Sequence, residues 1–143
     1  MPSVPLHYVD LRAFCFVTED DKRVEDALRT FLPEDVPVDR ATSEGHHGDR
    51  ILVLSARVEN ADEVRTVLEQ VGELPGKQLG RVRDELDERA DENCSLFLTF
   101  EKQDAFDGEV RLGDGITFRA KVEAYPANKD AAVENARDIF ERL

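Results

Sequence analysis

The clearest strand signal in this chain is the stretch Ile116-Thr117-Phe118-Arg119-Ala120-Lys121-Val122-Glu123-Ala124-Tyr125. Apolar and polar side chains alternate along it, and successive side chains of a strand point to opposite faces of a sheet. The apolar set should therefore face a core and the polar set should face away from it. A sheet with one polar face is typically antiparallel, so we expect hairpin connections and helices packed on one side.

The same alternation appears near the other end of the sequence, over residues 8–17. There the side chains expected to point away from the core are Tyr8, Asp10, Arg12, Phe14 and Phe16. Other strand-like segments are shorter, and a tight turn at Gly113-Asp114-Gly115 precedes the last strand. We predict these shorter strands at residues 36–42, 51–58, 95–101 and 109–112.

Helices are expected where apolar residues recur at helical spacing after a capping residue. The segment Thr18-Glu19-Asp20-Asp21 begins the first helix, which Pro33 ends, and Asn60 begins the next. Pro75-Gly76 separates that helix from another that ends near Ala90, and a final helix starts near Asp130. The predicted order is β-α-β-β-α-α-β-β-β-α, in one two-layer α+β domain spanning residues 1–143.

The charge balance is strongly acidic, with 32 acidic against 19 basic residues and a formal net charge of −13. Lysine is scarce, at 5 against 14 arginines. An acidic surface poor in lysine is typical of proteins that work in molar salt, where charge repulsion is screened. An ordinary acidic protein is the alternative. We find no membrane-spanning run and no secretion signal, so we expect a cytoplasmic protein.

The acidic charge is concentrated in the predicted helices. Residues 18–35, 59–92 and 128–143 carry 22 acidic and 11 basic residues, whereas the rest of the chain carries 10 and 8. A strand face that combines arginine with aromatic rings is typical of RNA-binding sheets. The same pattern also fits a solvated face or the interface of a dimer. The basic side chains expected at outward strand positions are Arg12, Arg57, Arg111, Arg119 and Lys121.

Two of the three histidines lie in the loop of residues 43–50, between two predicted strands. Adjacent residues of an extended segment point to opposite faces, so His46 and His47 are poorly placed to share a metal ion. We expect Gly45 and Gly48 to set the loop's shape and His46 to form a hydrogen bond within it. Contact with RNA is the alternative for this loop.

No pattern in the sequence predicts catalysis, a cofactor or a metal. A serine with histidine and aspartate at motif spacing is missing, and so is a phosphate-binding glycine loop. Cys15 and Cys94 lie in apolar surroundings and are expected to be buried and reduced. Lys102-Gln103 ends a predicted strand, where it could either bind a phosphate and a base edge or stabilise the following loop.

Several short segments, taken in order, resemble a family of small archaeal proteins described as predicted RNA-binding proteins or exosome subunits. His47 stands where that family usually has tyrosine or phenylalanine, and Asp49-Arg50 replaces a common Asn-Pro. The matching segments are Arg12-Ala13-Phe14-Cys15, Thr18-Glu19-Asp20, Glu44-Gly45-His46-His47-Gly48-Asp49, Lys102-Gln103, Ala105, Gly108, Leu112, Asp114-Gly115-Ile116 and Tyr125-Pro126.

This resemblance implies a fold like that of the large-subunit ribosomal protein that binds 5S rRNA, with RNA as partner. Together with the basic face it predicts a non-catalytic RNA-binding protein, associated with exosome or ribosome machinery. The alternative is a protein-interaction module or homodimer that uses the same face and has no RNA role. The candidate RNA-binding residues are Arg12, His46, Arg50, Arg57, Lys102, Gln103, Arg111, Arg119 and Lys121.

Overall fold

The computed structural model describes residues 4–44 and 50–143, which form five strands and six helices. Three helices begin at a side-chain cap: Asp20, Asn60 and Asn128 each accept a hydrogen bond from a backbone N–H of the first turn. The elements are β1 Leu6–Cys15, α1 Asp21–Arg29, β2 Asp39–Glu44, β3 Arg50–Val58, α2 Ala61–Val71, α3 Gly76–Asp84, α4 Leu86–Arg89, β4 Ser95–Glu101, α5 Lys102–Phe106, β5 Gly115–Val122 and α6 Lys129–Glu141.

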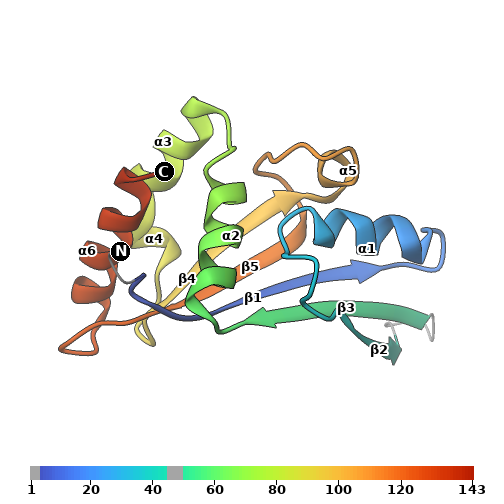
Figure 1. Ribbon diagram of the computed structural model, residues 1–143, viewed down its shortest axis with the longest axis horizontal. Helices are drawn as coiled ribbons and strands as arrows, with labels where there is room; N and C mark the ends of the chain where they lie inside the picture. Colours follow the sequence, from blue (N-terminus) through green and yellow to red (C-terminus); the bar gives the residue numbers. More distant parts are fainter. Residues whose placement is uncertain (1–3, 45–49) are drawn as a thin grey trace.

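The five strands form one sheet in the order β2-β3-β1-β5-β4, and every neighbouring pair is antiparallel (Figure 1). Two of its pairings, β2 with β3 and β4 with β5, join strands consecutive in the chain. The strands β1 and β5, far apart in the sequence, lie side by side at the centre. Their alternation predicted an antiparallel α+β sheet, and the structure confirms it.

The helices cover one face of this sheet, and the other face is left without a helix among the residues described (Figure 1). The covered face is apolar, because the β5 side chains Ile116, Phe118, Ala120 and Val122 are all at most 2% exposed. Side chains that alternate with them on β1 and β5 are half-buried or exposed. We call this second side the open face.

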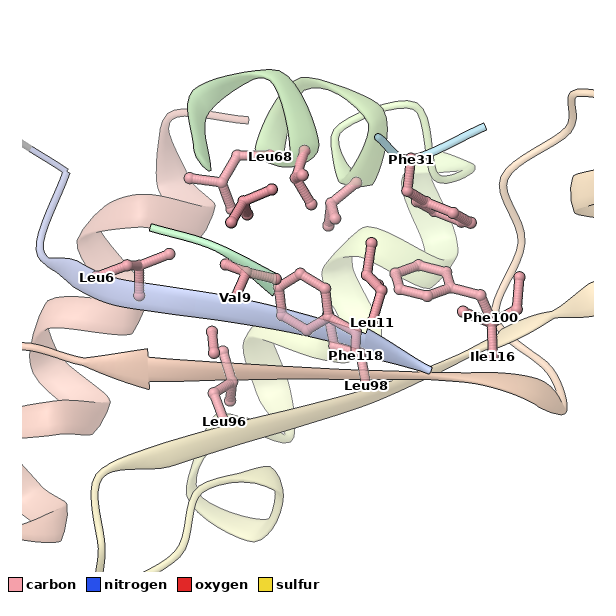
Figure 2. Close-up of a cluster of buried hydrophobic side chains, with 14 of the residues drawn as sticks. Leu6, Val9, Leu11, Phe31, Leu68, Leu96, Leu98, Phe100, Ile116 and Phe118 are labelled. Carbon is pink, nitrogen blue, oxygen red and sulfur yellow. The ribbon is translucent and has the colours of Figure 1, made fainter. Parts of the chain in front are cut away.

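A cluster of phenylalanines fills the core between sheet and helices. The Phe31 and Phe100 ring centroids are 4.7 Å apart, and Phe118 meets Phe100 edge to face at 6.1 Å. Leu68 of α2 lies above the β1 side chains Leu6, Val9 and Leu11 (Figure 2). The helix α2 therefore closes the core over the centre of the sheet.

The two edges of the sheet differ. Along β4, the segment after α5 donates and accepts backbone hydrogen bonds, from Glu101 N to Arg111 O at 2.8 Å and from Gly113 N to Thr99 O at 3.1 Å. The opposite edge strand, β2, is exposed at all six positions. One edge is thus partly covered by the chain itself, and the other faces solvent.

The largest departure from the predicted element order concerns residues 102–112. The expected strand at 109–112 makes only an isolated bridge, Phe100 with Leu112, because the Leu112 N–H donates to the Gln78 side chain at 2.8 Å. Residues 102–106, expected as strand end and loop, form α5 instead. The Thr30 hydroxyl donates to the Ala105 carbonyl at 2.7 Å and fixes α5 against α1.

Smaller differences are found in two other elements. The predicted strand at 36–42 begins at Asp39, because Val36 is buried and its carbonyl accepts a hydrogen bond from Arg29 at 3.0 Å. The predicted helix ending near Ala90 is two helices, α3 and α4, with Glu85 between them.

Candidate functional site

Strand register brings charged residues of three strands into one row on the open face. Asp10 of β1 pairs with Arg57 of β3 on one side and with Arg119 of β5 on the other. Phe97 of β4 extends the row, because it pairs with Arg119. Side chains at paired positions point to the same face, so these four residues are neighbours.

One carboxylate in this row holds two guanidinium groups. Arg57 Nε and Nη2 lie 2.7 and 2.9 Å from the two Asp10 oxygens, and Arg119 Nη2 lies 3.0 Å from Asp10 Oδ2. The hydrogen bonds to Asp10 raise the pKa of Arg57 above its usual value, so Arg57 stays charged. The trio keeps a net charge of +1 and unused N–H donors that face solvent.

Aromatic rings contact three arginines of the open face. The Tyr8 ring centroid lies 4.0 Å from Arg57 Cζ and 5.9 Å from Arg119 Cζ, and Arg12 Cζ lies 5.8 Å from the Phe14 ring centroid. Cation–π contacts of this kind restrict a long side chain without using its N–H donors. The guanidinium groups are thus oriented before any ligand arrives.

A shallow hollow of about 560 Å³ lies over this part of the open face. It is bounded by charged and aromatic side chains from all five strands of the sheet. Since its floor is a sheet, the hollow is wide enough for an extended ligand rather than a deep pocket for a small molecule. Its lining includes Asp10, Arg12, Asp39, Arg57, Phe97 and Arg119.

Of the candidate residues, Arg12, Arg57 and Arg119 come together in this hollow. Lys121 lies beside it, paired with Tyr8, and its ammonium donates to the Asn93 carbonyl. Arg50 is exposed, but it lies seven positions before Arg57, an odd offset along the strand, so it points toward the helix side of the sheet. His46 lies outside the described residues.

The prediction that Lys102 contacts RNA is corrected by the structure. A side chain that binds a phosphate must be exposed, and Lys102 is buried. It is 8% exposed, and its Nζ donates to Glu19 Oε1 at 2.7 Å and to the Phe14 carbonyl at 2.9 Å. The side chain therefore joins the start of α5 to the end of β1. Gln103 beside it is exposed and borders a second hollow of about 320 Å³.

Arg111 also lies away from the open face, because the strand predicted around it does not form. Its Nε is 3.6 Å from Glu109 Oε2, and it lines a hollow with Gln70, Glu73 and Pro75 on the helix side. The prediction that placed Arg111 with the other outward strand residues was wrong.

Sequence reasoning missed two residues that shape these hollows. Asp10 was placed on the outward face, but its role as the shared partner of two arginines needed the register of β1, β3 and β5. Arg23 of α1 lies with its Cζ 4.0 Å from the Phe106 ring centroid and lines the second hollow. Only the unexpected helix α5 brings Phe106 there.

The described residues include both cysteines of the chain. Both cysteines are free and buried, and burial raises the pKa of Cys15, so its thiol stays protonated. No group of three or more histidine, cysteine, aspartate or glutamate side chains that could hold a metal is found in residues 4–44 and 50–143. Within these same residues, none of the helices is long and apolar enough to span a membrane.

This protein has an α+β fold whose sheet leaves one face, with arginines and aromatic rings, uncovered by helices. Proteins of this class are suited to binding extended, anionic ligands. A family model described as RNA binding matches residues 8–122, which include Asp10, Arg57, Phe97 and Arg119 of the row on this face. The chain belongs to that family.

Three archaeal relatives each match nearly the whole chain. RNA-binding protein PAB1135 of Pyrococcus abyssi is 33% identical, with 94% of both chains covered. The structure of Mth689, a DUF54 protein from Methanothermobacter thermautotrophicus, is 39% identical with a TM-score of 0.78, covering 94% of this chain and 98% of its own. Protein AF2318 from Archaeglobus fulgidus is 27% identical with a TM-score of 0.84, covering 94% and 99%. The predicted likeness to the protein that binds 5S rRNA stays a prediction.

Proposed function

We propose that this protein binds RNA through the open face of its sheet and does not catalyse a reaction. The observation that carries the proposal is the row of Arg57, Asp10 and Arg119, with Arg12 in the same hollow. Guanidinium groups suit phosphate oxygens, because their planar N–H donors match the geometry of an oxyanion. The family's description as RNA binding supports the same ligand.

The charge distribution supports RNA over a cationic partner. The chain has a net charge of −13, yet the hollow on the open face is lined by three arginines against two aspartates, and Lys121 lies beside it. A local cationic surface on an acidic protein attracts a polyanion to that surface and repels it elsewhere. RNA would therefore meet the molecule at the strands and not at the helices.

We extend the proposal to a cellular setting. The resemblance to predicted exosome subunits supports membership in an RNA-processing assembly of the cytoplasm. Sequencing the RNA crosslinked to the protein in its own cells would identify the target, and proteins recovered with it would identify the assembly. Recovery of neither RNA nor processing enzymes would count against this setting.

Reversing one charge of the row should weaken RNA binding. For Arg119→Glu we expect an affinity for total RNA at least tenfold lower, and a shallower dependence on salt because one phosphate contact is lost. Filter binding at several KCl concentrations measures both quantities. Arg137→Glu, an exposed position on α6, makes the same change in net charge away from the open face and should bind as the wild type does.

The same variant separates the proposal from its rival, a homodimer through the open face. Light scattering gives the oligomeric state of the wild type and of Arg119→Glu. A dimer that dissociates in Arg119→Glu while RNA binding is unchanged would favour the rival. Retention of RNA by neither protein, at any salt concentration, would contradict RNA binding itself.

We also propose that the protein works in concentrated salt, supported by its acidic excess and scarcity of lysine. Raising KCl from 0.1 to 2 M should increase the free energy of unfolding by about 1–2 kcal/mol, because repulsion among the helix carboxylates is screened. Urea denaturation at each KCl concentration measures this. Tetramethylammonium chloride, which also screens charge, should give a similar increase. A free energy of unfolding that stays constant or falls as KCl rises would exclude salt adaptation.

A further inference from the structure

Three phenylalanine rings on or beside the open face are exposed to solvent. Phe14 of β1 is 41% exposed, Phe97 of β4 is 37% exposed, and Phe16, just after β1, is 50% exposed. A single exposed apolar side chain is ordinary on a protein surface. Phe14 and Phe97, however, lie on the face that carries the arginines: Phe14 two residues after Arg12 on β1, and Phe97 on β4 paired with Arg119.

Each of these rings has a cationic neighbour. Arg12 Cζ lies 5.8 Å from the Phe14 ring centroid, Lys102 Nζ lies 5.4 Å from that of Phe16, and Phe97 pairs with Arg119. Phe97 also lines the same hollow as the arginines of the open face. A ligand seated in this hollow would therefore meet the Phe97 ring together with three guanidinium groups.

The rings and the cations are spread over a part of the sheet that an extended RNA chain can span. Neighbouring strands lie about 4.8 Å apart, and residues two apart on one strand lie about 6.7 Å apart. By strand register Phe97 lies two strands across from Asp10, and Phe14 lies four residues along β1 from Asp10. The arginines lie between the two rings, so the rings would serve bases that are not adjacent. A protein ligand would need apolar side chains to cover the rings and acids to meet the arginines, whereas each unpaired nucleotide carries both a flat apolar surface and a negative charge.

Resting on the proposed function, we propose that the open face binds unpaired RNA. Bases stack on Phe14 and Phe97, and phosphates lie against Arg12, Arg57 and Arg119. In a duplex the base faces are already stacked on one another, so the rings would gain nothing. Double-stranded RNA is recognised mainly through its phosphates and 2′-hydroxyls.

The test compares a fluorescein-labelled RNA of 12 mixed nucleotides with the same strand annealed to its complement. Anisotropy is measured at the lowest KCl concentration at which circular dichroism shows the protein folded. We expect the single strand to bind at least tenfold more tightly than the duplex. We also expect Phe14→Leu combined with Phe97→Leu to lose at least tenfold affinity for the single strand, because leucine keeps the apolar character but offers no ring face.

Tyr125→Leu is the matched control, since Tyr125 is 90% exposed but lies beyond the last residue of β5. It should bind the single strand as tightly as the wild type. Equal or tighter binding of the duplex, or unchanged affinity in the folded double variant, would overturn the preference for unpaired RNA and leave RNA binding standing. Binding of neither probe would overturn both proposals.

Discussion

Replacing Gly115 by alanine is expected to lower the free energy of unfolding by about 2–4 kcal/mol. Gly115 has a φ of +114°, a backbone conformation that residues other than glycine rarely adopt. A Cβ atom there would also lie 2.6 Å from Lys102 Cβ, well inside van der Waals contact. The turn before β5 therefore cannot accept a methyl group unless β5 or α5 moves.

The matched control is Gly80→Ala. Gly80 lies inside α3, and a Cβ atom there would meet nothing within 4 Å. Alanine should stabilise the protein by about 0.5–1 kcal/mol, because it is the better helix former. Urea denaturation of both variants at the same KCl concentration measures the difference. A Gly115→Ala protein as stable as the wild type would show that the turn adapts freely.

Replacing Lys102 by methionine is expected to cost about 2–3 kcal/mol of stability. Methionine has a similar size but leaves Glu19 and the Phe14 carbonyl without the ammonium that now bonds to both. The Lys102 side chain is 10% exposed and that of Glu19 is 20% exposed, so water can replace the lost partner only in part. The cost should therefore exceed that of an ordinary surface lysine.

A double-mutant cycle isolates this interaction. Lys102→Met and Glu19→Gln are measured singly and together by urea denaturation, with Lys77→Met, at an exposed position of α3, as control. The double variant should lose less than the sum of the two single losses, and the control should change by less than about 0.5 kcal/mol. Strict additivity would mean that the pair is not coupled.

The sheet was predictable because its signal is local. Alternation in residues 116–125 and 8–17 identified the two central strands and the face that each side chain takes. Capping residues such as Asn60 identified helix starts in the same way. These patterns depend on neighbours in the sequence, and those neighbours remain neighbours in the fold.

The candidate site was predictable only in part, since its details depend on residues far apart in the sequence. Alternation placed Arg12, Arg57 and Arg119 outward, but only strand register shows that Asp10 joins two of them. Lys102 stands between Glu101 and Gln103 and has the sequence context of an exposed residue. Its partner Glu19 is 83 positions away, and no periodicity reports a contact of that kind.

The difference between the two sheet edges bears on how copies of this protein avoid polymerising. An unpaired edge strand is a template for another chain, and charged side chains commonly prevent that pairing. In molar salt, however, repulsion between charges extends only about 3 Å. The β4 edge is closed differently: its Glu101 N–H and Thr99 carbonyl are already bonded within the chain. These hydrogen bonds do not weaken as charges are screened, so the β2 edge relies on its side chains to stay unpaired more than the β4 edge does.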